Sequence, residues 1–367
     1  MNKTYKYSKN GDIRQFQQSM SAKKIRVIQE IYSVLQTMVK TKTSKTPKPK
    51  FTNTDNYVYL QNFGLLRPFV INAKYLNIMS RIAESELVLN SDGSIYHLKL
   101  HPEEIAHNII VVGDPGRVAS ISSHFDRIEI QRQNREIITH TGYIGSKRLT
   151  VLSTGMGTDN IDIVLNELDA LVNIDLKKRE AKSEHTELNI IRLGTSGALQ
   201  ADIPVDSTVI STHGIGIDGM LYYYRDIKKV YHQEMTDAFI SQSNWDSNFP
   251  RPYAVAASEK LFEIFAKEHL QGITATAPGF YGPQGRKLRL DTAHPDLNKA
   301  IADFNFEGQR IVNFEMETSA LYGLGKLLGH NTLTICAIIA NRVSKTYSKD
   351  YQTTVKKLVV SVLEKLS

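Results

Sequence analysis

From Asn108 onward, short apolar runs alternate with glycine turns and amphipathic stretches. Four runs are apolar at almost every position, namely 108–112, 149–153, 188–193 and 333–340. A strand with one solvated face alternates apolar and polar residues, whereas a run that is apolar throughout belongs to a strand covered by helices on both faces. The pattern therefore predicts an α/β fold, a three-layer αβα sandwich around a central sheet.

Two segments carry apolar residues at helical spacing, one at 160–172 and one near the C-terminus. Each pattern predicts a helix that buries one stripe against the sheet. The apolar positions are Ile161, Val164, Leu165, Leu168 and Val172 in the first, and Val355, Leu358, Val359, Val362, Leu363 and Leu366 in the second.

The first 78 residues have a different character. They carry 14 Lys and Arg against 3 acidic residues, a net charge of +11. Because the whole chain has a net charge of +7, residues 79–367 carry −4. The Lys/Thr/Pro tract 40–50 cannot bury enough apolar area to offset the ordering of its backbone, which predicts a solvated linker. Residues 23–38 favour a short amphipathic helix, and 51–78 show no clear period. We expect a basic, disordered N-terminal extension over 1–78 and one folded domain over 79–367.

Two interpretations of this extension stay open. In one, the functional protein begins at or near Met79, because the residues from there on make an ordinary enzyme N-terminus. In the other, the extension is a genuine basic arm, a common feature of globular proteins.

Composition bounds the class of protein. The 367 residues are 41% apolar and 23% charged, which is typical of a globular chain. The single cysteine, Cys336, excludes a disulfide scaffold and a cysteine-based zinc or iron–sulfur cage, since these need several thiolates at one site, and it favours a reducing compartment. No apolar run approaches a membrane span, and the N-terminus lacks the apolar region of a signal peptide. We therefore expect a soluble, cytoplasmic protein without a membrane partner.

Glycine turns follow three of the predicted strands. They read GDPGR at 113–117, STGMG at 153–157 and RLGTSG at 192–197. Backbone N–H groups of such turns bind anions readily, although each turn alone is more often a plain tight turn. None matches the dinucleotide pattern GxGxxG or the P-loop, so neither a dehydrogenase nor an NTPase has support.

Arg192 makes an anion site the better interpretation. It ends an apolar strand, where an unpaired guanidinium is costly and is normally kept only with a partner anion. The structural alternative is an ion pair with a carboxylate such as Glu167. With Arg117 and Arg135, Arg192 would form a cluster of three guanidinium groups, which suits a small dianion such as phosphate.

Five motifs occur in order along the domain. They are GDPGRV at 113–118, STGMG at 153–157, RLGTSGAL at 192–199, FYGPQGR at 280–286 and NFEMET at 313–318. Together they resemble the nucleoside phosphorylase family, and within it the uridine phosphorylases. The resemblance runs from about Tyr96 to the C-terminus. It implies the nucleoside phosphorylase fold, with a mixed central sheet, and phosphate-dependent cleavage of uridine to uracil and ribose 1-phosphate.

The resemblance also implies residue roles. The phosphate-binding residues are Gly113, Arg117, Arg192, Gly194 and Thr195, with Arg135 supplied by a neighbouring subunit. The ribose-binding residues are Met316 and Glu317, with His97 reaching across a subunit interface. The base-binding residues are Ser196, Gly197, Phe280, Gln284, Arg286 and Phe314. The catalytic residues are Arg286, Arg192 and Glu317.

The chemistry of these side chains suits the reaction. The Glu317 carboxylate can accept from the 2′ and 3′ hydroxyls, and its charge favours the developing ribosyl cation, whereas Glu315 alone would be an ordinary helix N-terminal residue. Phe280 can stack on a flat ring, and Gln284 presents a donor and an acceptor that match N3–H and O2 of uracil. Arg286 would stabilise the uracil anion as it leaves.

One position separates pyrimidine from purine members. By resemblance, bacterial purine enzymes place an aspartate after the strand at 333–340, where this chain has Asn341 and Arg342. The missing acid favours uracil leaving as an anion. A purine nucleoside phosphorylase or a nucleosidase of the same fold is the alternative within enzymes. A noncatalytic nucleoside- or RNA-binding protein that uses the basic extension is the alternative from another class, although nucleic acid is the less favoured partner.

The resemblance also implies partners. The substrates are a small nucleoside and inorganic phosphate as co-substrate, with no cofactor. Arg135 and His97 act in trans, which predicts a homo-oligomer. The long, charged connection between Glu167 and Arg192 leaves dimer and hexamer both open. Asn160 stands where some relatives have a serine that helps hold potassium, so no metal is predicted.

Overall fold

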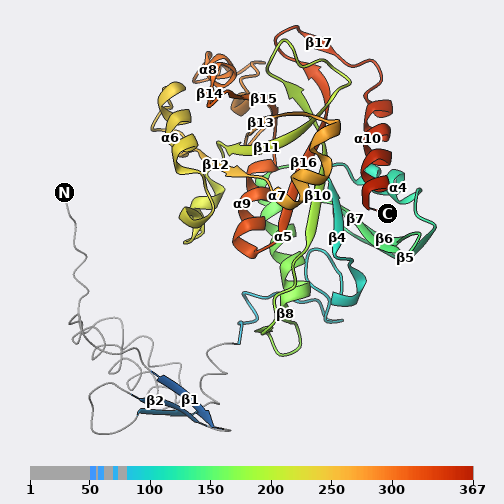
Figure 1. Ribbon diagram of the computed structural model, residues 1–367, viewed down its shortest axis with the longest axis vertical. Helices are drawn as coiled ribbons and strands as arrows, with labels where there is room; N and C mark the ends of the chain where they lie inside the picture. The colour runs from blue at the N-terminus through green and yellow to red at the C-terminus, as the bar shows by residue number, and fades with distance from the viewer. Residues whose placement is uncertain (1–49, 55–56, 62–68, 73–80, 367) are drawn as a thin grey trace, which may run out of the picture. The chain divides into compact units, whose positions relative to one another are not determined.

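The computed structural model describes residues 81–366 and three short segments that precede them. The segments are β1 (Lys50–Thr54), β2 (Tyr57–Gln61) and β3 (Phe69–Asn72), which form an antiparallel sheet in the order β1-β2-β3. The chain divides into two units, Met1–Met79 and Ser80–Ser367 (Figure 1). These strands lie almost wholly in 51–78, a stretch to which the sequence pattern assigns no structure. The helix predicted over 23–38 lies outside the described residues.

The second unit alternates strands and helices along most of its length. In chain order these are β4 (Asn108–Val112), α4 (Pro115–Ser122), β5 (Arg127–Asn134), β6 (Ile137–Ile144), β7 (Lys147–Ser153), α5 (Thr158–Asn173), β8 (Ile174–Asp175), β9 (Glu180–Ala181), β10 (Asn189–Ala198), β11 (Thr208–Gly216), α6 (Gln233–Gln242), β12 (Tyr253–Ala256), α7 (Glu259–Phe265), β13 (Leu270–Thr276), α8 (Leu297–Asp303), β14 (Asn305–Phe306), β15 (Gln309–Glu315), α9 (Thr318–Leu328), β16 (Asn331–Asn341), β17 (Thr346–Tyr347) and α10 (Tyr351–Leu366).

The main sheet is mixed. Its strands lie in the order β14-β15-β13-β11-β16-β10-β4-β7-β6-β5, with β12 beside β11 and β17 beside β16. β10 is parallel to β16 and to β4, and β4 is parallel to β7, whereas β11 runs antiparallel to β16 and β6 antiparallel to β7. This arrangement confirms the predicted α/β fold with a mixed central sheet.

Strand β4 shows why the apolar runs read as central strands. Ile109 and Val111 pack in a cluster with α5 and α9, while Ile110 and Val112 pack in a cluster with α4, α7 and α10. All four side chains have no exposed surface. Helices therefore cover both faces of the sheet, as the three-layer prediction requires. No helix in residues 81–366 is long and apolar enough to span a membrane.

Strand β10 makes a third pairing, in addition to those with β16 and β4, and this pairing positions the site. It pairs antiparallel with β15, through Gly197 opposite Phe314 and Ala198 opposite Asn313. The pairings among β10, β16, β11, β13 and β15 thereby form a closed ring within the larger sheet. The register of β10 on β16 shifts between Ser196 and Gly197, and such a bulge bends a strand and re-aims its end. This closure, which the sequence does not predict, brings the turn 192–197 beside the motif 313–318.

Candidate active site

A cavity of about 570 Å³, called here the active-site cavity, lies where β4, β7, β10, β15 and β16 end. Most residues with a predicted role line it. These are Gly113, Arg117, Arg192, Gly194, Thr195, Ser196, Gly197, Phe280, Gln284, Arg286, Phe314, Met316 and Glu317. The five sequence motifs therefore meet at one place, although they span about two hundred residues of chain.

Other residues that received no site role also line the cavity. They are Asp114, Pro115, Glu136, Gly155, Met156, Glu315, Ile339, Ala340 and Tyr347. Several lie beside motif residues in the sequence and could have been found by that adjacency. Tyr347 could not, because it reaches the cavity only through the β16–β17 hairpin, in which it lies opposite Ala340.

Arg192 is the charged centre of the cavity. It is buried, and its guanidinium forms ion pairs with Glu317 through Nη2 and with Glu315 through Nη1, the latter at 3.3 Å. The structural alternative, an ion pair with a carboxylate, is therefore present, but the partners are Glu315 and Glu317 and the suggested Glu167 is wrong. The Arg192 Nε has no hydrogen-bond partner among the described residues. A buried donor without a partner is costly, so this atom retains the capacity to bind an anion.

Arg117 lies next to Arg192 at the same end of the cavity. Its Nη1 donates to the backbone oxygen of Leu193 at 3.0 Å. Burial lowers the pKa of Arg117, and the nearby positive charge of Arg192 lowers it further. Two guanidinium groups that repel one another in a buried place are the arrangement expected of an anion site.

Glu315 and Glu317 lie just before the first residue of helix α9 and have different hydrogen-bond partners. The Glu315 carboxylate accepts from the backbone N–H of Thr318 at 3.0 Å and from Thr276 Oγ1 at 2.7 Å, so it caps the helix, as its position suggested. Glu317 accepts from the backbone N–H of Gly157 at 2.8 Å and contacts Arg192. Burial raises the pKa of Glu317, and the charge of Arg192 opposes that rise. Glu317 is thus held rigidly from two sides while it lines the cavity.

Because Gly194 has no side chain, it leaves room for the Arg192 guanidinium. A Cβ at this position would collide with Arg192 Nη1 and would lie 2.8 Å from Cys336 Sγ. We expect Gly194→Ala to displace the end of the flexible arginine side chain. The KM for phosphate should then rise about tenfold or more, which corresponds to the loss of one charge-assisted hydrogen bond. Steady-state kinetics with varied phosphate test this, with Gly145→Ala as a control. A Cβ at Gly145 meets nothing within 4 Å, and the strain that its φ of +56° imposes on alanine falls in a turn outside the cavity. An unchanged phosphate KM in Gly194→Ala would contradict the role given to this glycine.

The other end of the cavity carries groups suited to a flat, polar ring. Arg286 Nη1 donates to Gln284 Oε1 and to the Phe280 backbone oxygen, each at 2.6 Å. Its guanidinium carbon lies 3.7 Å from the centre of the Phe280 ring. The Gln284 amide is buried; its oxygen accepts from Arg286 and keeps a second lone pair, so the amide still presents an acceptor beside its NH₂ donors. Burial lowers the pKa of Arg286.

Asn341 ends strand β16 at the position where purine-cleaving members were expected to carry an acid. Its buried side chain donates to the backbone oxygens of Gln200 and Ile203, at 2.8 Å and 2.7 Å. Asn341 therefore stabilises a turn and does not line the active-site cavity.

His97 and Arg135, which were expected to act in a neighbouring subunit, do not line the cavity of their own chain. His97 Nδ1 lies 2.6 Å from Glu167 Oε1, and the Glu167 carboxylate also accepts from the backbone N–H groups of His97 and Leu98. Arg135 is exposed, with its guanidinium carbon 5.9 Å from the centre of the Tyr96 ring. Their roles across an interface stay predictions.

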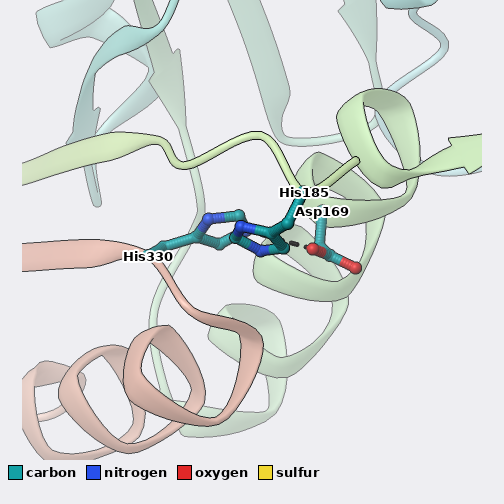
Figure 2. Close-up of side chains that lie close together, drawn as sticks. All are labelled: Asp169, His185 and His330. Atoms are coloured by element: carbon teal, nitrogen blue, oxygen red, sulfur yellow. Dashed lines mark ion pairs between the residues drawn. The ribbon is translucent and has the colours of Figure 1, made fainter. Parts of the chain in front are cut away.

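One group of side chains away from the cavity has the composition of a metal site (Figure 2). Asp169, His185 and His330 bring one ligand atom each within 4.8 Å of one another, and His330 Nε2 lies 3.2 Å from Asp169 Oδ1. However, His330 Nδ1 accepts from the Leu188 backbone N–H, so the ring proton of a neutral His330 must be on Nε2, the atom that faces Asp169. That nitrogen then has no lone pair for a metal. His185 Nε2 lies 2.9 Å from the Leu328 backbone oxygen at the end of α9, which suits a structural cap. The hydrogen bonds do not fit a metal centre.

Comparison with known proteins places this geometry among enzymes that act on nucleosides. Residues 108–366 match the model of the phosphorylase superfamily. A uridine phosphorylase of Thermococcus kodakarensis is 28% identical over 272 residues, which cover 74% of this chain and 86% of the relative. A DeoD-type purine nucleoside phosphorylase of Bacillus cereus is 27% identical, covering 73% and 97%. The crystal structure of a Trypanosoma brucei nucleoside phosphorylase with uridine phosphorylase activity is similar at a TM-score of 0.68 and 30% identity, covering 76% of this chain and 98% of that one.

Proposed function

This chain belongs to the phosphorylase superfamily, and on that premise we propose that it is a uridine phosphorylase, a pentosyltransferase that converts uridine and inorganic phosphate to uracil and ribose 1-phosphate. One observation carries the proposal. A single cavity has two guanidinium groups at one end, the buried Arg192 and the half-buried Arg117, and an amide with a further guanidinium at the other. The first pair suits a phosphate, and the second suits the polar edge of uracil.

The reaction needs positioning and charge stabilisation more than covalent help from the protein. A phosphate oxygen attacks C1′ as the C1′–N1 bond breaks, and the bonding electrons leave with the base as a uracil anion that water later protonates. Arg117 and Arg192 hold the phosphate beneath the sugar, which replaces a rare collision by a fixed geometry. Arg286 neutralises the charge that gathers on the base in the transition state.

Glu317 acts on the sugar between these two ends. A carboxylate held by the Gly157 N–H and by Arg192 keeps lone pairs to accept from the ribose hydroxyls. Its negative charge also favours the positive charge that develops on the ribosyl ring. Met316 lies beside it in the cavity wall, against the sugar.

The proposal extends to assembly and to cellular role. We place the enzyme in the cytoplasm, in pyrimidine nucleoside salvage, as a homo-oligomer with its active sites at subunit interfaces. The exposed Arg135 and the partly exposed His97 support this, because both are available to a neighbouring subunit. They would complete the phosphate and ribose sites there.

The direct test is to measure uracil release from uridine with and without inorganic phosphate. We expect release only when phosphate is present, because the Arg192 end of the cavity binds the nucleophile. Inosine should be cleaved at about a hundredth of the uridine rate or less, since the side chains at the base end of the cavity, Phe280, Gln284 and Arg286, include no acid that could protonate a leaving purine. Equal rates without phosphate would indicate a nucleosidase, and faster cleavage of inosine would indicate a purine nucleoside phosphorylase. Binding of uridine without any cleavage would indicate a noncatalytic binding protein.

A further inference from the structure

Ser196 and Asn313 come together only because β10 and β15 pair. Ser196 lies in the wall of the active-site cavity and is 5% exposed, whereas Asn313 is fully buried behind it. The Asn313 Nδ2 donates to Ser196 Oγ at 2.8 Å. The Asn313 side chain does not line the cavity, so any influence on substrate must pass through Ser196.

Asn313 is the middle of a buried chain of hydrogen bonds that leads away from the cavity. Thr274 Oγ1 donates to Asn313 Oδ1 at 2.7 Å, and Ser211 Oγ lies 2.5 Å from Thr274 Oγ1. Ser211 and Thr274 are both fully buried. The order of the chain is thus Ser211, Thr274, Asn313 and Ser196, from the core to the cavity.

The direction of this chain follows from its inner end. Among the described residues, Ser211 Oγ has Thr274 Oγ1 as its one hydrogen-bond partner. A hydroxyl proton left unbonded in a dry core is costly, so Ser211 donates to Thr274. The Thr274 proton must then go to the oxygen of the Asn313 amide, which turns the NH₂ group of that amide toward Ser196.

The proton at the outer end of the chain, on Ser196, is therefore not used within the chain. Ser196 Oγ already accepts from Asn313, so the Ser196 O–H points elsewhere. Its other polar neighbour is the thiol of Cys336, which is within hydrogen-bonding reach of Ser196 and whose pKa burial raises to about 11. A protonated thiol is only a weak acceptor. A carbonyl oxygen of a base in the cavity is a better acceptor than this thiol, so the proton turns there when the base is bound. Each donor in the chain polarises the next, which strengthens the hydrogen bond that Ser196 donates.

We propose that Asn313 is a positioning residue that aims the Ser196 hydroxyl proton at the leaving base, so that Ser196 shares with Arg286 the stabilisation of the departing anion. This inference rests on the proposed cleavage of uridine. It assigns to Asn313, Thr274 and Ser211 a role in catalysis that reaches the substrate only through Ser196.

The test compares two leaving groups in two variants. Asn313→Asp keeps the shape of the side chain but replaces its donor by an acceptor, which would draw the Ser196 proton away from the cavity. Ser196→Ala removes the hydroxyl itself, so it tests the contribution of the same hydrogen bond to the cleavage rate if Asn313→Asp does not fold. Single-turnover rates are measured with uridine and with 5-fluorouridine, whose fluorine stabilises the departing anion without help from the protein.

We expect both variants to slow uridine cleavage by about tenfold or more, which is the effect of one lost hydrogen bond to a charged group. The loss with 5-fluorouridine should be about threefold, because less stabilisation is required of the protein. The phosphate KM should not change. Asn173→Ala is the matched control, since it removes a mostly buried amide bonded to Asp169 and Thr186 outside the cavity. It should lower stability and leave both rates of the folded enzyme unchanged.

The outcomes are distinguishable. Equal losses with both nucleosides, or no loss in either variant, would overturn the role of Asn313 and Ser196 and leave the proposed function intact. A wild-type protein that cleaves no uridine would overturn the proposed function and, with it, this inference.

Discussion

Replacing Arg192 by glutamine should lower kcat/KM for uridine phosphorolysis by about a thousandfold, the upper range for loss of one preorganised electrostatic contact. Arg192 is 5% exposed and lines the cavity, and its buried Nε has no hydrogen-bond partner among residues 81–366. Glutamine retains a donor but neither the charge nor the planar fork that matches a phosphate. The kcat/KM of Arg192→Lys should lie between those of the wild type and Arg192→Gln, because lysine restores the charge without the planar fork. Kinetics with varied phosphate would measure both variants.

The same substitution should also destabilise the fold, and this effect must be separated from activity. Without Arg192, Glu315 and Glu317 face one another buried and without a cation. Breaking a buried ion pair on one side typically costs about 3–5 kcal/mol. Thermal unfolding gives this cost, and rates are then expressed per folded molecule. Arg148→Gln is the control, because Arg148 bonds Glu129 and the backbone oxygen of Ile105 away from the cavity. Normal phosphorolysis by folded Arg192→Gln would refute the assignment of the phosphate site.

Arg286→Ala should lower uridine turnover by about a hundredfold, since a guanidinium that neutralises a developing anion acts mainly in the transition state. The KM for phosphate should stay unchanged, because Arg286 lies at the base end of the cavity with Gln284 and Phe280. Its neighbour Lys287 provides the control. That side chain is exposed, pairs with Asp291 and does not line the cavity, so Lys287→Ala should be active. A near-normal rate in Arg286→Ala would remove Arg286 from the mechanism.

The elements of the fold could be predicted from local pattern. The apolar run 108–112 coincides with β4, and the stripe predicted for 160–172 lies on α5, where Ile161, Val164, Leu165 and Leu168 are fully buried. A strand that is buried on both faces requires one local order of apolar residues, and a helix that is buried on one face requires another. That order is visible in the sequence, so the α/β class followed from it.

Much of the candidate site was also accessible, because its residues occur in compact motifs at strand ends. Glycine turns and an arginine at the end of an apolar strand are local features, and they predicted an anion site before any resemblance was considered. Tyr347 was missed because nothing in its own neighbourhood distinguishes it from a surface residue, whereas Glu136 was missed although it follows Arg135, which had a predicted role.

The partners of these residues were decided by the tertiary structure alone. The sequence offered Glu167 as the carboxylate for Arg192, but the chain brings Glu317 there from 125 positions away, and Glu167 binds the His97 backbone. The closure of β10 onto β15 likewise joins Ser196 to Asn313 across 117 positions. Local pattern determines which surfaces must be buried, because burial depends on the spacing of apolar residues along the chain. It does not determine which buried charges and hydroxyls meet, because many pairings satisfy the same spacing and only the packing of the whole sheet selects one.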